Sequence, residues 1–169
     1  MRGRTTRWIL PLLLVSVSGV GVAMAATAST ASKKGTVMTA HSSKFGTILV
    51  ASNGMTLYRY TPDMKHESAC TGACATYWPP LLVKAGATPT AGSGATASLL
   101  GTTKRSNGAM QVTYAGWPLY FYAGDKKAGQ TNGQGFEKSW YVVSTTGALV
   151  KARVKTTGTT TSTKKSAWG

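Results

Sequence analysis

The chain contains one segment twice. Residues Ile48 to Val83 match Met110 to Thr145 at a constant spacing of 62 residues, without a gap. The identical pairs include Val50 and Val112, Gly54 and Gly116, Leu57 and Leu119, Tyr58 and Tyr120, Tyr60 and Tyr122, Asp63 and Asp125, and Trp78 and Trp140. A self-match at a fixed period marks repeated supersecondary units, which bury their apolar faces against each other. We therefore expect two related units that share one core.

The local sequence of each unit predicts short antiparallel strands. Thr47 to Ala51 and Met55 to Tyr60 flank an Asn-Gly turn at residues 52–54, a strong hairpin signal because both residue types tolerate positive φ. Further hairpins are expected at Leu99–Lys104 with Met110–Tyr114, at Met110–Tyr114 with Trp117–Tyr122, and at Trp140–Ser144 with Ala148–Val154. Only Ser68 to Tyr77 indicates a helical turn. The expected class is mainly β, with two antiparallel meanders packed into one small sandwich- or barrel-like domain.

The beginning of the chain predicts export. A basic start precedes an apolar run from Trp8 to Val22 and the small residues Ala23-Met24-Ala25, typical of a signal peptide for the general export route. The run is shorter than the roughly 20 residues of a spanning helix, so we expect no membrane span after cleavage; the alternative is a retained anchor. The predicted divisions are a signal peptide at 1–25, a disordered lead at 26–35, a single β domain at 36–155 (repeat unit 1 about 36–84, connector about 85–97, repeat unit 2 about 98–155) and a disordered Thr/Ser/Lys tail at 156–169.

The charge is strongly basic, with 19 Lys and Arg against four Asp and Glu and a formal net charge of +15. Removal of the signal peptide would leave 16 basic residues against four acidic ones, a formal charge of +12. Such a surface attracts anionic polymers or membrane headgroups, although it also serves solubility or life in an acidic medium. The basic residues are scattered and form no nucleic-acid motif, so the expected partner is an anionic cell-envelope polymer and not a nucleic acid.

Each unit carries two tyrosines and an aspartate at fixed spacing. Strand geometry places Tyr58 and Tyr60 on one face and Leu57 and Arg59 on the other, and Asp63 follows in a turn. The second unit repeats them as Tyr120, Tyr122 and Asp125. The favoured interpretation is structural: each carboxylate caps a loop by accepting a backbone N–H or a tyrosine hydroxyl. The alternative is an acid/base pair or cation site formed by both aspartates, as in a hydrolase.

The two cysteines, Cys70 and Cys74, predict a disulfide, because an exported protein folds in an oxidising compartment. The alternative adds His66 and makes a copper or thiol-redox site, since the three residues would share one face if this segment were a helix. No nucleophile elbow, zinc-protease signature or P-loop occurs, so we expect no enzymatic activity and no cofactor. The Gly-rich segment Gly129 to Gly135 is expected to be an ordinary surface loop.

Aromatic side chains offer a second kind of candidate site. Tyr77, Trp78, Trp117 and Trp140 are able to form a sugar- or polymer-binding face, and core packing is the favoured alternative.

The combined pattern resembles a known family. Its pieces are Gly46-Thr-Ile-Leu-Val50, Gly54-Met-Thr-Leu-Tyr58, Trp78-Pro-Pro-Leu-Leu82, Gly116-Trp-Pro-Leu-Tyr120, Gly129-Gln-Thr-Asn-Gly-Gln-Gly135 and Trp140-Tyr-Val-Val143. They resemble the bacterial secreted repeat, often carried by predicted lipoproteins, that has a Y-x4-D motif. The resemblance implies export, tandem repeats and a bacterial origin, and assigns the motif to the six Tyr and Asp residues above and the cysteine pair to Cys70 and Cys74. This chain lacks a lipid-anchor cysteine, so a soluble or loosely wall-bound form is implied.

The expected function is therefore that of an exported, non-enzymatic β-repeat protein at the cell envelope that binds anionic or sugar polymers. The alternative is an extracytoplasmic copper or thiol-redox protein that uses His66, Cys70 and Cys74.

Overall fold

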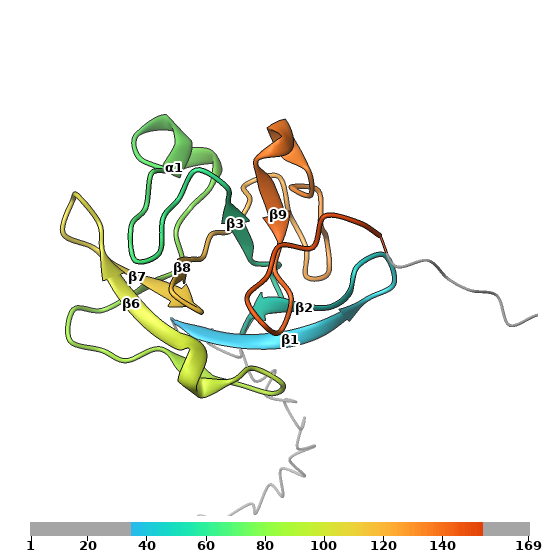
Figure 1. Cartoon of the computed structure of the whole chain (residues 1–169), viewed down its shortest axis with the longest axis horizontal. Coiled ribbons are helices and arrows are strands. Elements are labelled where there is room, and N and C mark those ends of the chain that lie inside the picture. The colour runs from blue at the N-terminus through green and yellow to red at the C-terminus, as the bar shows by residue number, and fades with distance from the viewer. Residues whose placement is uncertain (1–34, 154–169) are drawn as a thin grey trace, which may run out of the picture.

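The computed structural model describes residues 35–153 and is mainly β, which confirms the expected class (Figure 1). The strands are β1 (Thr36–Ser42), β2 (Gly46–Ala51), β3 (Tyr58–Tyr60), β4 (Leu82–Val83), β5 (Thr90–Ala91), β6 (Leu100–Lys104), β7 (Met110–Tyr114), β8 (Trp117–Pro118) and β9 (Trp140–Val142). The helical turns are α1 (Ala73–Tyr77), η1 (Ala97–Leu99) and η2 (Phe136–Lys138). The predicted signal peptide, almost all of the predicted lead, and the tail lie outside the described residues. Among residues 35–153, no helix is long and apolar enough to span a membrane.

The strands form three small sheets. One has the order β2-β1-β5, one pairs β3 with β9, and one has the order β4-β7-β6 with β8 paired to β7. The named strand pairs are antiparallel except β1 with β5, which is parallel. The expected helical turn before Trp78 is present as α1.

The two units begin with equivalent hairpins, β1–β2 and β6–β7. Both predicted turns that follow them are present, but they differ in length. Ala51 donates its N–H to Met55 across three residues, whereas Tyr114 pairs with Trp117 across two. The two-residue turn has positive φ at Ala115 and at Gly116, as a type I′ turn requires.

This difference shifts the repeat by one residue in the strand before the turn. The amide of Leu49 donates to Val143 at 2.8 Å, and the amide of Val112 donates to Leu81 at 2.8 Å. Leu81 and Val143 are equivalent at a spacing of 62, so Leu49 is the structural counterpart of Val112. The ungapped match of Val50 with Val112 is therefore wrong in this strand. The extra residue of the first turn is the cause.

Two segments were not expected to be strands. The sequence of β1 alternates poorly, yet β1 pairs with β2 from Val37 to Ser42. The predicted connector supplies β5, where Gly92 donates its amide to Val37 at 2.8 Å. A Cβ on Gly92 would lie 2.4 Å from Cγ of Met38, so small residues let the connector pack against β1.

Strand segments of each unit pair with strand segments of the other unit. Tyr58 and Tyr120 face each other and donate their amides to one another's carbonyls at 2.8 and 3.0 Å. On one side, β3 of the first unit pairs with β9 of the second. On the other, Phe121 of the second unit donates its amide to Pro79 of the first at 2.8 Å. Each tyrosine strand thus lies against the segment of the other unit that carries the repeated tryptophan, as expected of a pseudo-twofold arrangement.

Alternation along these strands separates two hydrophobic clusters. Leu57 and Leu119 are fully buried in the first cluster, whereas Tyr58 and Tyr120 are fully buried in the second. The predicted division of the strand faces is therefore confirmed, and both units contribute to both clusters.

Candidate functional site

The repeated tyrosines and aspartates form bonds between the units and not within them. The hydroxyl of Tyr58 donates to Oδ2 of Asp125 at 2.6 Å, and the hydroxyl of Tyr120 donates to Oδ2 of Asp63 at 2.8 Å. All four residues are buried. The motif is contiguous in sequence, but its hydrogen bonds are reciprocal across the pseudo-twofold axis.

The other oxygen of each carboxylate fixes a loop in its own unit. Oδ1 of Asp63 accepts the amide of Ala69 at 2.8 Å, and Oδ1 of Asp125 accepts the amide of Asn132 at 2.8 Å. A buried carboxylate that accepts a hydroxyl and a backbone N–H is a loop anchor. Each aspartate therefore ties the loop of its own unit to the tyrosine of the other.

Burial controls the protonation of these groups. Burial raises the pKa of Asp63 to about 6. The hydrogen bonds from Ala69 and Tyr120 and the positive charges of Arg105 and Arg59 act in the opposite direction and lower this pKa, but burial has the larger effect.

Burial also raises the pKa of Asp125. The pKa values of Tyr58 and Tyr120 lie far above that of a free tyrosine, because burial disfavours the phenolate and each ring faces a carboxylate. The tyrosines thus remain hydrogen-bond donors at physiological pH.

This arrangement does not favour the acid/base hypothesis for Asp63 and Asp125. Four pockets on the surface of residues 35–153 are lined by other residues, and neither carboxylate contributes to any of these four. Both are engaged by donors from the protein itself. The geometry agrees instead with the structural interpretation, in which each carboxylate fixes a loop by accepting a backbone N–H and a tyrosine hydroxyl. That the tyrosine belongs to the other unit was not expected.

Four aromatic rings, two from each unit, form a stack between the units. Trp78 and Trp140 lie parallel with their ring centroids 3.8 Å apart. Tyr60 stacks on Trp140 at 4.2 Å, and Tyr122 stacks on Trp78 at 4.3 Å. Each tyrosine thus contacts the tryptophan of the other unit, and both tryptophans are nearly inaccessible to solvent.

The structure brings three of the four candidate binding aromatics together. Tyr77, Trp78 and Trp140 line one pocket. Trp117 lies elsewhere, under the guanidinium of Arg59 at 3.7 Å from the ring centroid, and is half-buried. Burial lowers the pKa of Arg59 to about 10, and its Nη1 donates to the carbonyl of Gly147. Trp117 is thus a structural partner of an arginine and not part of the aromatic pocket.

Cys70 and Cys74 form the predicted disulfide. Their sulfurs are therefore not thiolates in this structure, and no group of three or more His, Cys, Asp or Glu within residues 35–153 is arranged to hold a metal ion. His66 instead contacts the turn of the second unit: its amide donates to Gly116 at 2.8 Å, and its carbonyl accepts the hydroxyl of Thr103. The copper or redox alternative gains no support from this arrangement.

A buried arginine holds the disulfide loop, and the sequence did not point to it. Arg105 donates to the carbonyl of Cys70, to Oγ of Ser68 and to Oε1 of Gln111. Ser68 also bonds the hydroxyl of Tyr120 at 2.7 Å. The signal was weak because Arg105 follows β6 directly before an ordinary Ser-Asn-Gly turn and has no counterpart in the first unit.

The segment from Gly129 to Gly135 is more than the expected surface loop. Gly133 is buried, its amide donates to the hydroxyl of Tyr58, and a Cβ there would lie 2.7 Å from the ring of Trp78. Gln134 accepts the amide of Val142 and donates to Val150. The prediction was wrong here because the glycines permit close packing against aromatic rings, which composition alone does not reveal.

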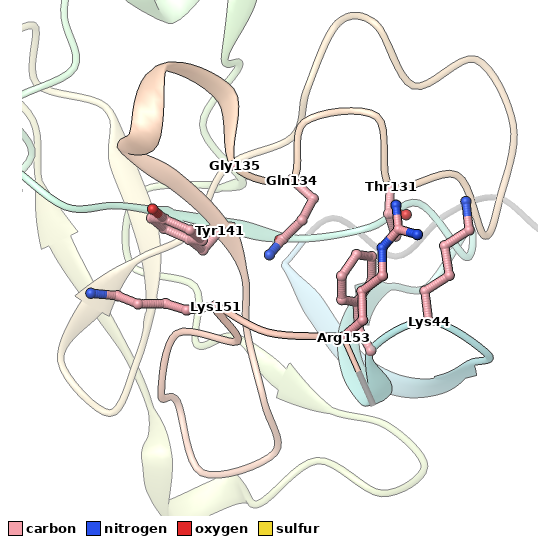
Figure 2. Close-up of a pocket in the computed structure, with 8 residues that line it drawn as sticks. Lys44, Thr131, Gln134, Gly135, Tyr141, Lys151 and Arg153 are labelled. Atoms are coloured by element: carbon pink, nitrogen blue, oxygen red, sulfur yellow. The ribbon is translucent and has the colours of Figure 1, made fainter. Parts of the chain in front are cut away.

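One further pocket is basic. It has a volume of about 290 Å³. Lys44 and Arg153 lie near Thr131, and Lys151 lies beside Tyr141 (Figure 2). The complete lining is Lys44, Phe45, Thr131, Gln134, Gly135, Tyr141, Lys151 and Arg153, which includes three cations and no carboxylate. An adjoining polar pocket of about 380 Å³ shares Lys44 and Thr131, and we call the two together the basic trough.

Comparison with known proteins identifies a family but no individual relative. No curated protein and no solved structure matches the chain. The family model described as a secreted repeat of unknown function matches twice, at residues 39–82 and 101–144, in agreement with the resemblance seen in the sequence. The two matches fall on the two units whose strand segments pair with each other, and together they cover more than half of the chain. The chain therefore belongs to the family of secreted repeats of unknown function.

Proposed function

We propose that this secreted repeat protein binds an anionic polymer of the cell envelope through its basic trough, without catalysis. The observation that carries the proposal is the trough itself, where Lys44, Lys151 and Arg153 meet without a lining carboxylate. These cations come from separate segments: the β1–β2 turn and the chain that follows β9. Folding thus concentrates positive charge that is scattered in the sequence.

The chemistry of the trough suits repeated phosphate or carboxylate groups. Clustered cations raise the local concentration of an anion and bind it in a salt-dependent manner. Hydroxyls and amides of Thr131, Ser42, Ser43 and Asn132 line the same trough and are able to bond the polar groups of a polymer. The net charge of +15 in the full sequence supports the same class of ligand.

The positions of the repeated carboxylates and of the cysteines support a role in binding more than a role in catalysis. The two buried carboxylates that an acid/base mechanism would use are bonded to tyrosines, and neither lines the basic trough or the pocket beside Trp78 and Trp140. The alternative redox function would require reduction of the disulfide between Cys70 and Cys74.

The test compares two triple variants of equal charge. Lys44→Gln, Lys151→Gln and Arg153→Gln neutralise the trough, and the control Lys65→Gln, Lys84→Gln and Lys104→Gln removes three exposed cations elsewhere. Each cation near a charged surface contributes on the order of 1 kcal/mol, so neutralising three should lower the affinity for poly(glycerol phosphate) at low salt by about a hundredfold. Affinity should also fall as salt rises.

Equal losses in both variants would show that the net charge, and not the trough, binds the polymer. No binding of the wild-type protein at low salt would remove the proposal altogether.

A further inference from the structure

A second pocket lies between the two units, at the helical turns that precede the two repeated tryptophans. α1 precedes Trp78, and η2 precedes Trp140; both stand at the same end of the molecule (Figure 1). The pocket between them has a volume of about 400 Å³. It is lined by Tyr60, Ala73, Cys74, Tyr77, Trp78, Phe136, Glu137 and Trp140, and we call it the aromatic cleft.

The walls of the aromatic cleft expose rings that a folded protein ordinarily buries. The large hydrophobic side chains exposed within residues 35–153 are Met64, Tyr77, Leu82 and Phe136, and two of these line this one pocket. Tyr77 is 65% exposed on the α1 side and Phe136 is 39% exposed on the η2 side. A concave site with exposed aromatic walls is typical of ligand binding.

Both walls are held in place. The disulfide between Cys70 and Cys74 fixes the start of α1, which carries Tyr77. On the other wall, Glu137 and Lys138 adopt left-handed backbone conformations, with φ of 48° and 55°. Such conformations are unfavourable for residues other than glycine and gather at ligand sites, where the surrounding structure maintains them.

We propose that the aromatic cleft binds a pyranose ring of a neutral oligosaccharide. A pyranose has an apolar C–H face, which packs on an aromatic ring, and a rim of hydroxyls, which need polar partners. Tyr77 and Phe136 supply the rings, and the carboxylate of Glu137 supplies acceptors at the same site. This volume holds one or two sugar rings.

Two other ligand classes fit less well. An aromatic cage for a quaternary ammonium needs free ring faces, but the faces of Trp78 and Trp140 are covered by each other and by Tyr60 and Tyr122. The basic protein also repels cations. A helical peptide needs an extended apolar groove, whereas this site is a short cleft bounded by two helical turns.

The experiment titrates the isotope-labelled chain with chitotetraose and with cellotetraose, followed by NMR chemical shifts. At least one of these neutral sugars should shift the signals of residues 73–77 and 136–140 in a saturable manner at millimolar concentration. Tyr77→Ala and Phe136→Ala should each weaken that binding by about tenfold, the loss typical of a ring that stacks on a ligand. Tyr77 is mostly exposed, so Tyr77→Ala should unfold at the wild-type urea midpoint. Phe136 also contacts the rings of Trp78 and Tyr122, so a urea unfolding curve must show that Phe136→Ala is folded at the titration conditions.

The matched controls are Met64→Ala and Leu82→Ala, which remove exposed apolar side chains outside the cleft and should leave the affinity unchanged. The trough variant should bind the sugar normally, so failure of the polymer proposal leaves this one standing, and the reverse also holds. Shifts with tetramethylammonium but not with the sugars, equal losses in the controls, or no saturable shifts with either sugar would each overturn the proposal.

Discussion

The exchange of tyrosine–aspartate bonds between units makes a quantitative prediction. Tyr58→Phe removes the hydroxyl that lies 2.6 Å from Oδ2 of Asp125 and leaves this buried carboxylate oxygen without its donor. A hydrogen bond to a charged group contributes about 1.5–3 kcal/mol, and a buried acceptor that loses its donor incurs a desolvation penalty of similar size. We therefore expect the free energy of unfolding to fall by about 2–3 kcal/mol. Tyr120→Phe should have a similar effect through Asp63.

The control for hydroxyl removal is Tyr141→Phe. The hydroxyl of Tyr141 donates to the carbonyl of Lys138 at 3.1 Å in an exposed position, so its loss should change the free energy of unfolding by less than about 0.5 kcal/mol. Urea unfolding measures each value, and an unchanged m-value shows that the variants unfold from an equally compact state.

Double-mutant cycles then identify the partners. Tyr58→Phe combined with Asp125→Asn removes both ends of one bond and should show a coupling of about 1 kcal/mol or more. Tyr58→Phe combined with Asp63→Asn removes two residues of the same sequence motif that are not bonded to each other, so their effects should add within about 0.5 kcal/mol. Coupling in the second pair and additivity in the first would refute the tyrosine–aspartate hydrogen bonds between the units.

Three further predictions concern the buried charges and the disulfide. Burial raises the pKa of Asp63 from 3.8 to about 6, so between these pH values the folded state binds a proton that the unfolded state does not. Lowering the pH from about 7 to 4 should therefore stabilise the wild type relative to Asp63→Asn by up to about 3 kcal/mol. A relative loss of stability in acid would contradict this. Replacing Cys70 and Cys74 by Ser should lower the free energy of unfolding in urea by about 2 kcal/mol. Reduction of the wild type with dithiothreitol should produce the same loss. Unchanged stability in both experiments would show that the disulfide does not stabilise the fold. Arg105→Met should lower the free energy of unfolding by about 2–4 kcal/mol, because it leaves three acceptors without this donor. Lys104→Met, at an exposed neighbour, should change it by less than about 0.5 kcal/mol. Equal effects of the two variants in thermal unfolding would show that the hydrogen bonds of Arg105 do not stabilise the fold.

The sequence predicts the class of the fold well because its strongest signals are local or periodic. The Asn-Gly turn after Ala51 and the alternation of Leu57 with Tyr58 depend on backbone geometry and on burial of one strand face, and both appear as expected. The disulfide also follows from local spacing and compartment. β1 was missed because its Thr, His and Ser residues form a poor strand pattern that pairing with β2 overrides.

The candidate sites were harder to predict because they depend on the relative placement of distant segments. An internal repeat predicts that two units pack together, but it does not tell whether Tyr58 bonds Asp63 or Asp125. The basic trough joins Lys44 to Arg153, which are separated by most of the domain. Trp78 and Trp117 look alike as aromatic candidates, yet only Trp78 reaches the axis. The tertiary arrangement decides each of these cases.

Interproton contacts measured by NMR on the intact chain test the pairing between the two units most directly. The account predicts cross-peaks between the indole protons of Trp78 and Trp140, whose centroids are 3.8 Å apart, and between the amide protons of Tyr58 and Tyr120. A spectrum in which each tryptophan contacts only its own unit, with no cross-peak between the two tyrosine amides, would contradict it.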